Sequence, residues 1–348
     1  MRAGIYRGIR TLVIEDVPDP VAGQGDIVLD VAVCGICGSD LHSYTEGAWI
    51  SDGMGMGHEF AGRVRAIGPG VDGLALGDAV TVNPFVPCGQ CAQCLSGRTN
   101  LCADASASGG TAFAEQILIH DVEVGRRVFA IPEGVTLEEA CLLEPLSVGM
   151  RAVALSGATA GQTVAVVGLG AIGQCVVQVL RAQGVTGIIA VDRSTMRLQR
   201  ALESGASATV DGSNGNLTDE LIALTHATVS PFQEASDVDV VIECAGAVGL
   251  LPAVLRATKA GGSVVFVGLF SRPVEIDINT VVQKELRLCG SFAYTVADVK
   301  NAFELIATGR VDMASLITHR RPLDELGAAF DDQLDGESSI KVVVGPGS

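Results

Sequence analysis

The pattern of hydrophobic and polar positions changes near the middle of the chain. Before about residue 150, short apolar runs such as 27–33 and 62–67 are separated by clusters of glycine, proline and aspartate at 18–26 and 68–78. Short apolar runs bounded by turn residues predict strands. We therefore expect the first part of the chain to be a β-rich domain with functional loops.

From residue 162 the pattern becomes one of buried strands that alternate with helical segments. Strands are predicted at 163–168, 187–191, 239–243 and 263–268, and helices near 171–183, 194–204, 217–226 and 248–258. Such alternation predicts an α/β domain with a parallel sheet and helices on both faces. A strand at 285–290, a helix near 297–308 and a terminal strand at 340–344 are expected to finish the sheet and rejoin the first domain.

One uncharged stretch, 152–180, is long enough to span a bilayer. Glycine and glutamine residues interrupt it, and its pattern changes from strand-like to helical, so a buried strand, turn and helix is expected instead. The N-terminal segment carries Arg2, Arg7 and Arg10 without an apolar block, unlike a signal peptide. The expected location is the cytoplasm.

Composition and charge narrow the classes of function. The 348 residues are 48% hydrophobic, and 23 basic against 40 acidic residues give a net charge of −17. This composition excludes a disordered chain, and the negative charge opposes binding to nucleic acid or to anionic membranes. In a reducing compartment the 10 cysteines would be thiols or metal ligands rather than disulfides.

A glycine-rich motif follows the predicted strand at 163–168. Gly168 would make a tight turn, Gly170 would let the backbone approach a pyrophosphate, and Gly173 would allow close helix packing. Asp192 ends the next predicted strand, where a carboxylate binds ribose hydroxyls and repels a 2′-phosphate. The motif predicts an NAD site; the alternative is an ordinary strand–turn–helix unit with a solvated aspartate.

Four cysteines form a local cluster: Cys88, Cys91, Cys94 and Cys102. Four thiolates without histidine suit a closed tetrahedral zinc site, which leaves no position for a substrate. The metal would then have a structural role and would fold a lobe, 83–102, that has little apolar content. The alternative is four free thiols or a redox pair.

A second set of possible metal ligands is dispersed along the chain. It comprises Cys37, the adjacent pair His58 and Glu59, and Glu144. One thiolate, one imidazole and one or two carboxylates are fewer strong ligands than a closed site uses, so a water or substrate oxygen could take the remaining position. Taken singly, each residue also fits an ordinary buried or hydrogen-bonded position.

Together these motifs resemble the zinc-dependent medium-chain dehydrogenase/reductase superfamily, and most closely its polyol, butanediol and threonine dehydrogenase branch. The resemblance spans the chain through Cys-Gly-Ile-Cys-Gly-Ser-Asp-Leu-His at 34–42, Gly-His-Glu at 57–59, the four-cysteine lobe, Leu-Glu-Pro-Leu-Ser-Val-Gly at 143–149 and Gly-Leu-Gly-Ala-Ile-Gly at 168–173. It implies a GroES-like β-rich catalytic domain over 1–150, completed by 291–348, and a Rossmann NAD-binding domain over 151–290. The active site would lie between them.

The resemblance also implies roles for individual residues. Cys37 and His58 match ligands of the catalytic zinc, and Glu59 matches an acid that binds the metal or lies just behind it. Glu144 matches the position where this branch uses a glutamate ligand. Which of the two glutamates binds the metal stays open.

Ser39 and His42 match a proton relay, whereas Asp40 is expected to hold its loop by hydrogen bonds. The cysteines without a ligand position are assigned to packing: Cys34, Cys141, Cys175, Cys244 and Cys289. The expected cofactor-binding residues are Gly168, Gly170, Ala171, Ile172, Gly173, Asp192, Arg193, Arg197, Val267, Gly268 and Leu269.

The predicted function is hydride transfer between NAD and a secondary alcohol or ketone, with one catalytic and one structural zinc in each chain of a homodimer or homotetramer. Sorbitol-type relatives carry Tyr after the relay histidine and Arg in a Phe-Arg-Tyr motif, where this chain has Ser43 and Ala293. We therefore expect a small or cyclic diol, with Tyr44 as a substitute polar contact. The alternatives are a simple secondary alcohol dehydrogenase, a threonine-type enzyme and a non-catalytic dinucleotide-binding homologue.

Overall fold

Two main sheets, each with its own buried core, lie in two different units of the chain. The computed structural model describes residues 1–107, 111–229 and 234–345. Unit 1 comprises Met1–Ser147 and Tyr294–Ser348, and unit 2 comprises Val148–Ala293. The first boundary falls inside one helix, α4 (Leu143–Ser156).

Unit 1 contains mostly short strands. Its strands are β1 (Arg2–Gly8), β2 (Thr11–Asp16), β3 (Ile27–Gly35), β4 (Glu59–Ile67), β5 (Ala79–Val82), β6 (Phe85–Val86), β7 (Ser106–Ala107), β8 (Gln116–Ile119), β9 (Val128–Ala130), β18 (Ile317–Pro322) and β19 (Lys341–Gly345). Its helices, besides the start of α4, are α1 (Gly38–Glu46), α2 (Ala92–Leu95), α3 (Leu137–Cys141), α10 (Val296–Ala307) and α11 (Leu326–Leu334).

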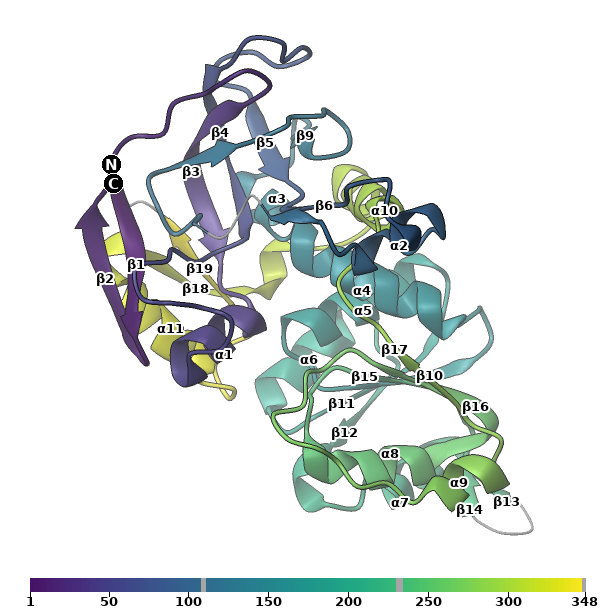
Figure 1. Ribbon diagram of the computed structural model, residues 1–348. Helices are drawn as coiled ribbons and strands as arrows, with labels where there is room; N and C mark the ends of the chain where they lie inside the picture. Colours follow the sequence, from purple (N-terminus) through teal and green to yellow (C-terminus); the bar gives the residue numbers. More distant parts are fainter. Residues whose placement is uncertain (108–110, 230–233, 346–348) are drawn as a thin grey trace. The chain divides into compact units, whose positions relative to one another are not determined.

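The main sheet of unit 1 has the order β18-β19-β3-β4-β5-β9, with β8 also paired to β3 (Figure 1). β3 is its central strand and is almost completely buried, because β4, β8 and β19 all pair with it. The C-terminal strand β19 therefore lies beside a strand from the first tenth of the chain. Large apolar side chains such as Phe60, Phe113 and Phe330 fill the core, and each contributes about 2 kcal/mol of hydrophobic stabilisation.

Unit 2 alternates strands and helices. Its strands are β10 (Thr163–Val167), β11 (Gly187–Asp192), β12 (Ala208–Asp211), β13 (Ala227–Val229), β14 (Glu234–Ser236), β15 (Val238–Glu243), β16 (Thr258–Phe266) and β17 (Arg287–Gly290). Its helices, besides the end of α4, are α5 (Ala171–Ala182), α6 (Thr195–Glu203), α7 (Leu217–Thr225), α8 (Leu251–Ala257) and α9 (Ile278–Gln283).

Six parallel strands form the main sheet of unit 2, in the order β12-β11-β10-β15-β16-β17. Figure 1 shows α5 and α6 on one face and α7 and α8 on the other. This confirms the predicted α/β fold class. The strand order reverses between β10 and β15, and ligands of such open sheets bind beyond the carboxyl ends of the strands at this point.

The uncharged stretch 152–180 takes the predicted form, since it contains β10 and most of α5 in addition to the end of α4. No helix in the described part of the chain combines the length and apolar composition needed to cross a bilayer.

Candidate functional site

In unit 1, the loop between β3 and α1 presents Cys37. Cys37 precedes the first residue of α1, and its backbone N–H donates to the carboxylate of Asp40 at 2.9 Å. Asp40 is therefore a helix-capping residue that holds the loop, as the sequence suggested. Ser39 and His42 lie three positions apart on α1, which places them on the same side of the helix.

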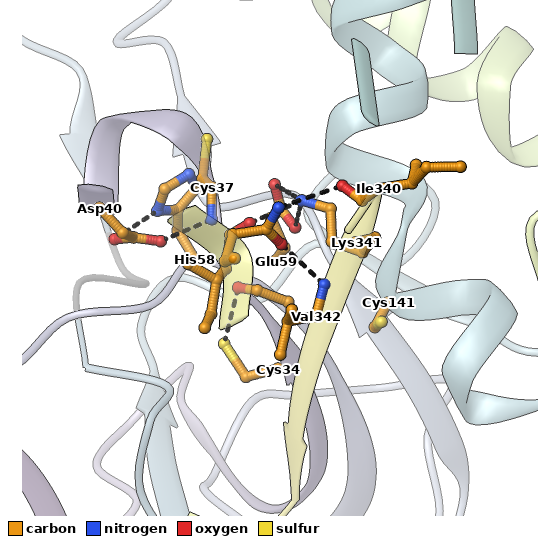
Figure 2. Close-up of polar contacts among 12 residues, drawn as sticks. Cys34, Cys37, Asp40, His58, Glu59, Cys141, Ile340, Lys341 and Val342 are labelled. Atoms are coloured by element: carbon orange, nitrogen blue, oxygen red, sulfur yellow. Dashed lines mark hydrogen bonds and ion pairs between the residues drawn. The ribbon is translucent and has the colours of Figure 1, made fainter. Parts of the chain in front are cut away.

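The His58 side chain extends toward the same loop. Its Nδ1 lies 3.6 Å from Oδ1 of Asp40. Figure 2 marks this ion pair with a dashed line. Burial lowers the pKa of His58, but the neighbouring Asp40 and Cys37 raise it well above its usual value overall. A histidine that meets a carboxylate through one ring nitrogen offers the other nitrogen to a metal. His58 and Cys37, together with Glu59, have ligand atoms within 4.8 Å of one another.

Glu59, the first residue of β4, is completely buried beside this pair. Both of its carboxylate oxygens accept from Nζ of Lys341, at 2.9 and 2.6 Å (Figure 2). Gly35 leaves room for the carboxylate, because a Cβ at that position would overlap Oε2 of Glu59. A glycine at position 35 is therefore required for the buried ion pair between Glu59 and Lys341.

Glu144, at the start of α4, differs from Glu59 in its surroundings. Its Oε2 is buried and has no hydrogen-bond partner among the described residues. Burial raises the pKa of Glu144 to about 7, although His58, Lys341 and the hydroxyl of Tyr294 oppose that shift. A buried carboxylate oxygen without a partner is unfavourable, so this group fits a position that a cation completes.

The four-cysteine lobe brings its sulfur atoms together. Cys88, Cys91, Cys94 and Cys102 have sulfur atoms within 4.8 Å of one another, with 3.4 Å between Cys88 and Cys102 and 3.8 Å between Cys91 and Cys102. A tetrahedron of 2.3 Å zinc–sulfur bonds places its sulfurs about 3.8 Å apart. The lobe therefore has the dimensions of a closed zinc–thiolate site.

In unit 2, a cavity of about 590 Å³ lies at the carboxyl ends of the parallel strands. The lining residues come from the ends of β10 and β11, from α6, and from the segments after β10, β11, β12 and β15: Val167, Gly168, Gly170, Val191, Asp192, Arg193, Arg197, Gly212, Ser213, Cys244, Ala245, Ala247, Gly249 and Leu250. Its size and position suit one part of a dinucleotide.

The glycine motif shapes one wall of this cavity. Gly168 has φ = 88°, and a Cβ there would overlap Ala245, whereas a Cβ on Gly170 would meet nothing within 4 Å. The backbone at Gly170 is therefore open to a ligand. A Cβ on Gly173 would overlap the carbonyl oxygen of Gly168, so a glycine is needed for the close approach of α5.

Asp192 connects the glycine motif to β11. Its Oδ2 accepts from the backbone N–H of Leu169 at 2.6 Å, and its Oδ1 accepts from those of Arg193 and Ser194. Arg197 Nη1 lies 4.0 Å from the same carboxylate. Asp192 is consequently fixed in place before any ligand binds.

Some of the expected cofactor-binding residues are not among those that line this cavity. Among the described residues, the lining of the cavity does not include Ala171, Ile172, Gly173, Val267, Gly268 or Leu269. Cys244, assigned to packing, lines the cavity instead. Tyr44 does not fit a role as a substrate contact, because its ring is buried against Phe330 in the core of unit 1.

Two residues of the unit 1 site were missed by sequence reasoning. Lys341 is a charged residue inside the apolar run at 340–344, and that contrast was the available signal. Tyr294 was noted only as part of its motif, yet its buried hydroxyl contacts the Glu144 carboxyl, and burial raises its pKa well above the usual range.

Comparison with known proteins gives consistent results over the whole chain. The model of the alcohol dehydrogenase GroES-like domain matches residues 23–133, and that of the zinc-binding dehydrogenases matches 171–308. The (R,R)-butanediol dehydrogenase of Neisseria gonorrhoeae is 34% identical over 369 residues, with 99% of each chain covered. The sorbitol dehydrogenase of Bacillus subtilis is 32% identical over 356 residues, with 99% and 97% covered.

A similar solved structure is that of a zinc-binding dehydrogenase from Sinorhizobium meliloti 1021, bound to NADP. It is 34% identical, has a TM-score of 0.87, and the match covers 99% of each chain.

We predict that Gly35→Ala destabilises unit 1, because the new Cβ would push the Glu59 carboxylate away from Lys341. Breaking a buried ion pair costs roughly 3 to 5 kcal/mol, and we expect a loss of about 3 kcal/mol in urea unfolding. Gly38→Ala is the matched control, since a Cβ there would meet nothing within 4 Å. Equal stability of the two variants would contradict this explanation of Gly35.

Proposed function

The chain belongs to the zinc-binding dehydrogenase family, and on this premise we propose that it is an NAD-dependent enzyme that interconverts a secondary alcohol and a ketone. The observation that supports this most is the grouping of Cys37, His58 and Glu59, whose ligand atoms lie within 4.8 Å of one another. The buried carboxyl group of Glu144 interacts with His58 in the same unit. We assign the catalytic domain to 1–150 with 291–348 and the NAD-binding domain to 151–290. The two compact units have similar bounds.

The donor set fits a catalytic zinc ion that Cys37 and His58 would hold together with a carboxylate from Glu59 or Glu144. A bound zinc ion supplies Lewis acidity, which lowers the pKa of an alcohol hydroxyl. Three protein ligands leave one position open for substrate or water. The carboxylate of Asp40 orients the imidazole of His58.

The proton released from the alcohol needs a path to solvent. Ser39 takes this proton and passes it toward His42. The His42 side chain is partly exposed and its Nδ1 lies 3.1 Å from Glu46, so it can release a proton to water. The cavity of unit 2 would hold a nicotinamide cofactor, which would supply the hydride acceptor.

The cavity charges favour NAD over NADP in this proposal. Asp192 is held rigidly by three backbone N–H groups, so its carboxylate would meet a 2′-phosphate directly. Arg193 and Arg197, which line the same cavity, offer the opposing positive charge. Because the Sinorhizobium relative was crystallised with NADP, the preference needs a direct test.

The substrate that fits best is a small or cyclic diol or polyol. The relatives from Neisseria and Bacillus are named for butanediol and sorbitol. A carboxylate ligand, with Glu59 and Tyr294 nearby, makes the metal environment polar enough to hold a second hydroxyl. Ala293 and Ser43 lack the groups that would bind the distal hydroxyls of sorbitol.

We predict two zinc ions per chain, one in each cluster, since four thiolates form a closed site and the mixed site stays open. Chelators should remove the mixed-site ion first, and activity should disappear before the fold does. Cys37→Ser should lose activity but not stability, whereas Cys94→Ser should lose stability. One zinc or fewer per chain in active enzyme, by elemental analysis, would refute the assignment.

We predict that NAD is used with at least ~10-fold higher kcat/KM than NADP, which corresponds to about 1.4 kcal/mol. Asp192→Ala should reduce that ratio by removing the repulsive carboxylate. Asp211→Ala is the matched control, because Asp211 ends the neighbouring strand β12 and caps its own turn through Ser213. If the wild-type enzyme used NAD and NADP with equal kcat/KM, Asp192 would not select between the two cofactors.

We predict that 2,3-butanediol or a cyclic diol is oxidised with kcat/KM at least ~100-fold above 2-butanol and ethanol, because a site built for a second hydroxyl discriminates against its absence. Sorbitol should rank below the small diols. Steady-state kinetics with these substrates and L-threonine provide the test. If 2-butanol or ethanol equals the best diol, a simple alcohol dehydrogenase is the better description, and L-threonine as the best substrate would favour the threonine-type alternative.

A further inference from the structure

Lys341, from the C-terminal strand β19, is buried directly behind the residues assigned to the metal. Its side chain is 3% exposed. Its Nζ donates to both oxygens of Glu59 and, at 2.8 Å, to the carbonyl oxygen of Ile36. Figure 2 shows the side chain of Lys341 beside the carboxylate of Glu59, with Cys37 and His58 on the far side of Glu59.

The two glutamates at the site have different electrostatic surroundings. Both oxygens of Glu59 already contact a cation, and the pair neutralises its own charge. The Oε2 of Glu144 is equally inaccessible to water but has no hydrogen-bond partner among the described residues. A buried charge needs a partner, and of these two carboxylates it is Glu144 that has an oxygen atom without one among the described residues.

We propose that Lys341 is a positioning residue that holds Glu59 out of the metal's ligand set, so that Glu144 completes the set with Cys37 and His58. This inference rests on the proposed function. It makes Glu144 the carboxylate ligand. The proximity of Glu59 to Cys37 and His58, taken alone, would make Glu59 the ligand instead.

The charges of the possible ligands show why Glu59 needs Lys341 as a counter-ion. One thiolate and one carboxylate balance a divalent cation. A second carboxylate without a counter-ion would add a negative charge and bind at the position that the substrate needs. Glu59 lies close enough to do so, because its ligand oxygen is within 4.8 Å of those of Cys37 and His58. Lys341 therefore keeps one ligand position open.

The first experiment compares Glu144→Gln with the double variant Glu59→Gln/Lys341→Met, in which the ion pair is replaced by neutral groups. Full-length zinc-loaded proteins are mixed with a chromogenic chelator, and cobalt-substituted samples give visible spectra. Glu144→Gln should release the catalytic-site metal roughly 10- to 100-fold faster and change the cobalt spectrum. The double variant keeps Cys37, His58 and Glu144, so it should release the metal more slowly than Glu144→Gln and keep the wild-type cobalt spectrum.

The second experiment uses Lys341→Met alone. The freed Glu59 should move to the open position, slow the release of the metal by at least ~10-fold and change the cobalt spectrum, and adding Glu59→Gln should restore both. A lysine with only a structural role would lower the midpoint of thermal unfolding and leave release and spectrum unchanged. Lys259→Met is the control for losing an ion-paired lysine, since Lys259 contacts Asp237 and Asp239 in unit 2.

The outcomes separate this inference from the function on which it rests. Faster release and a changed spectrum in the double variant, with Glu144→Gln like wild type, would overturn the inference and make Glu59 the ligand. The comparison of Glu144→Gln with the double variant distinguishes the two possible carboxylate ligands even if Lys341→Met does not fold. A wild-type protein that binds no metal at the Cys37 and His58 site would instead refute the proposed function.

Discussion

The buried ion pair between Lys341 and Glu59 is the interaction on which the arrangement of unit 1 depends. Removing two charges from water costs several kcal/mol per ion, which only close geometry and further hydrogen bonds recover. Here both carboxylate oxygens and the Ile36 carbonyl accept from one ammonium group. The pair joins β19, near the C-terminus, to the first residue of β4. Because His58 precedes Glu59, fixing Glu59 also fixes the backbone at His58.

In unit 2, carboxylates also hold loops in place, but their partners are backbone N–H groups. Asp192, at the end of β11, accepts from Leu169 in the glycine motif. Glu243, at the end of β15, accepts from Ala245 and Gly246 at 2.9 and 2.8 Å. Both loops lie at the carboxyl edge of the parallel sheet, where they shape the cavity. The cavity is therefore formed by internal contacts and does not depend on a ligand for its shape.

Sequence patterns predicted unit 2 better than unit 1, for physical reasons. Parallel strands buried on both faces give continuous apolar runs, and amphipathic helices give a clear period, so 163–168 and 171–183 correspond to β10 and α5. The two-residue strands β6 and β7 pair across about twenty residues and leave no such pattern. Helix α1 was not predicted, because its start depends on the capping contact between Cys37 and Asp40. The role of Lys341 depends on tertiary packing across the full length of the chain, which no local pattern records.

The central claim is that Cys37, His58 and Glu144 hold a metal ion while Lys341 retains Glu59. The most direct measurement is a crystal structure of the zinc-loaded protein with anomalous diffraction data on both sides of the zinc absorption edge. We expect two zinc peaks per chain, one inside the four-cysteine lobe and one bonded to Cys37, His58 and a Glu144 oxygen, with Glu59 still paired to Lys341. A zinc peak bonded to a Glu59 oxygen, or no peak beside Cys37 and His58, would contradict it.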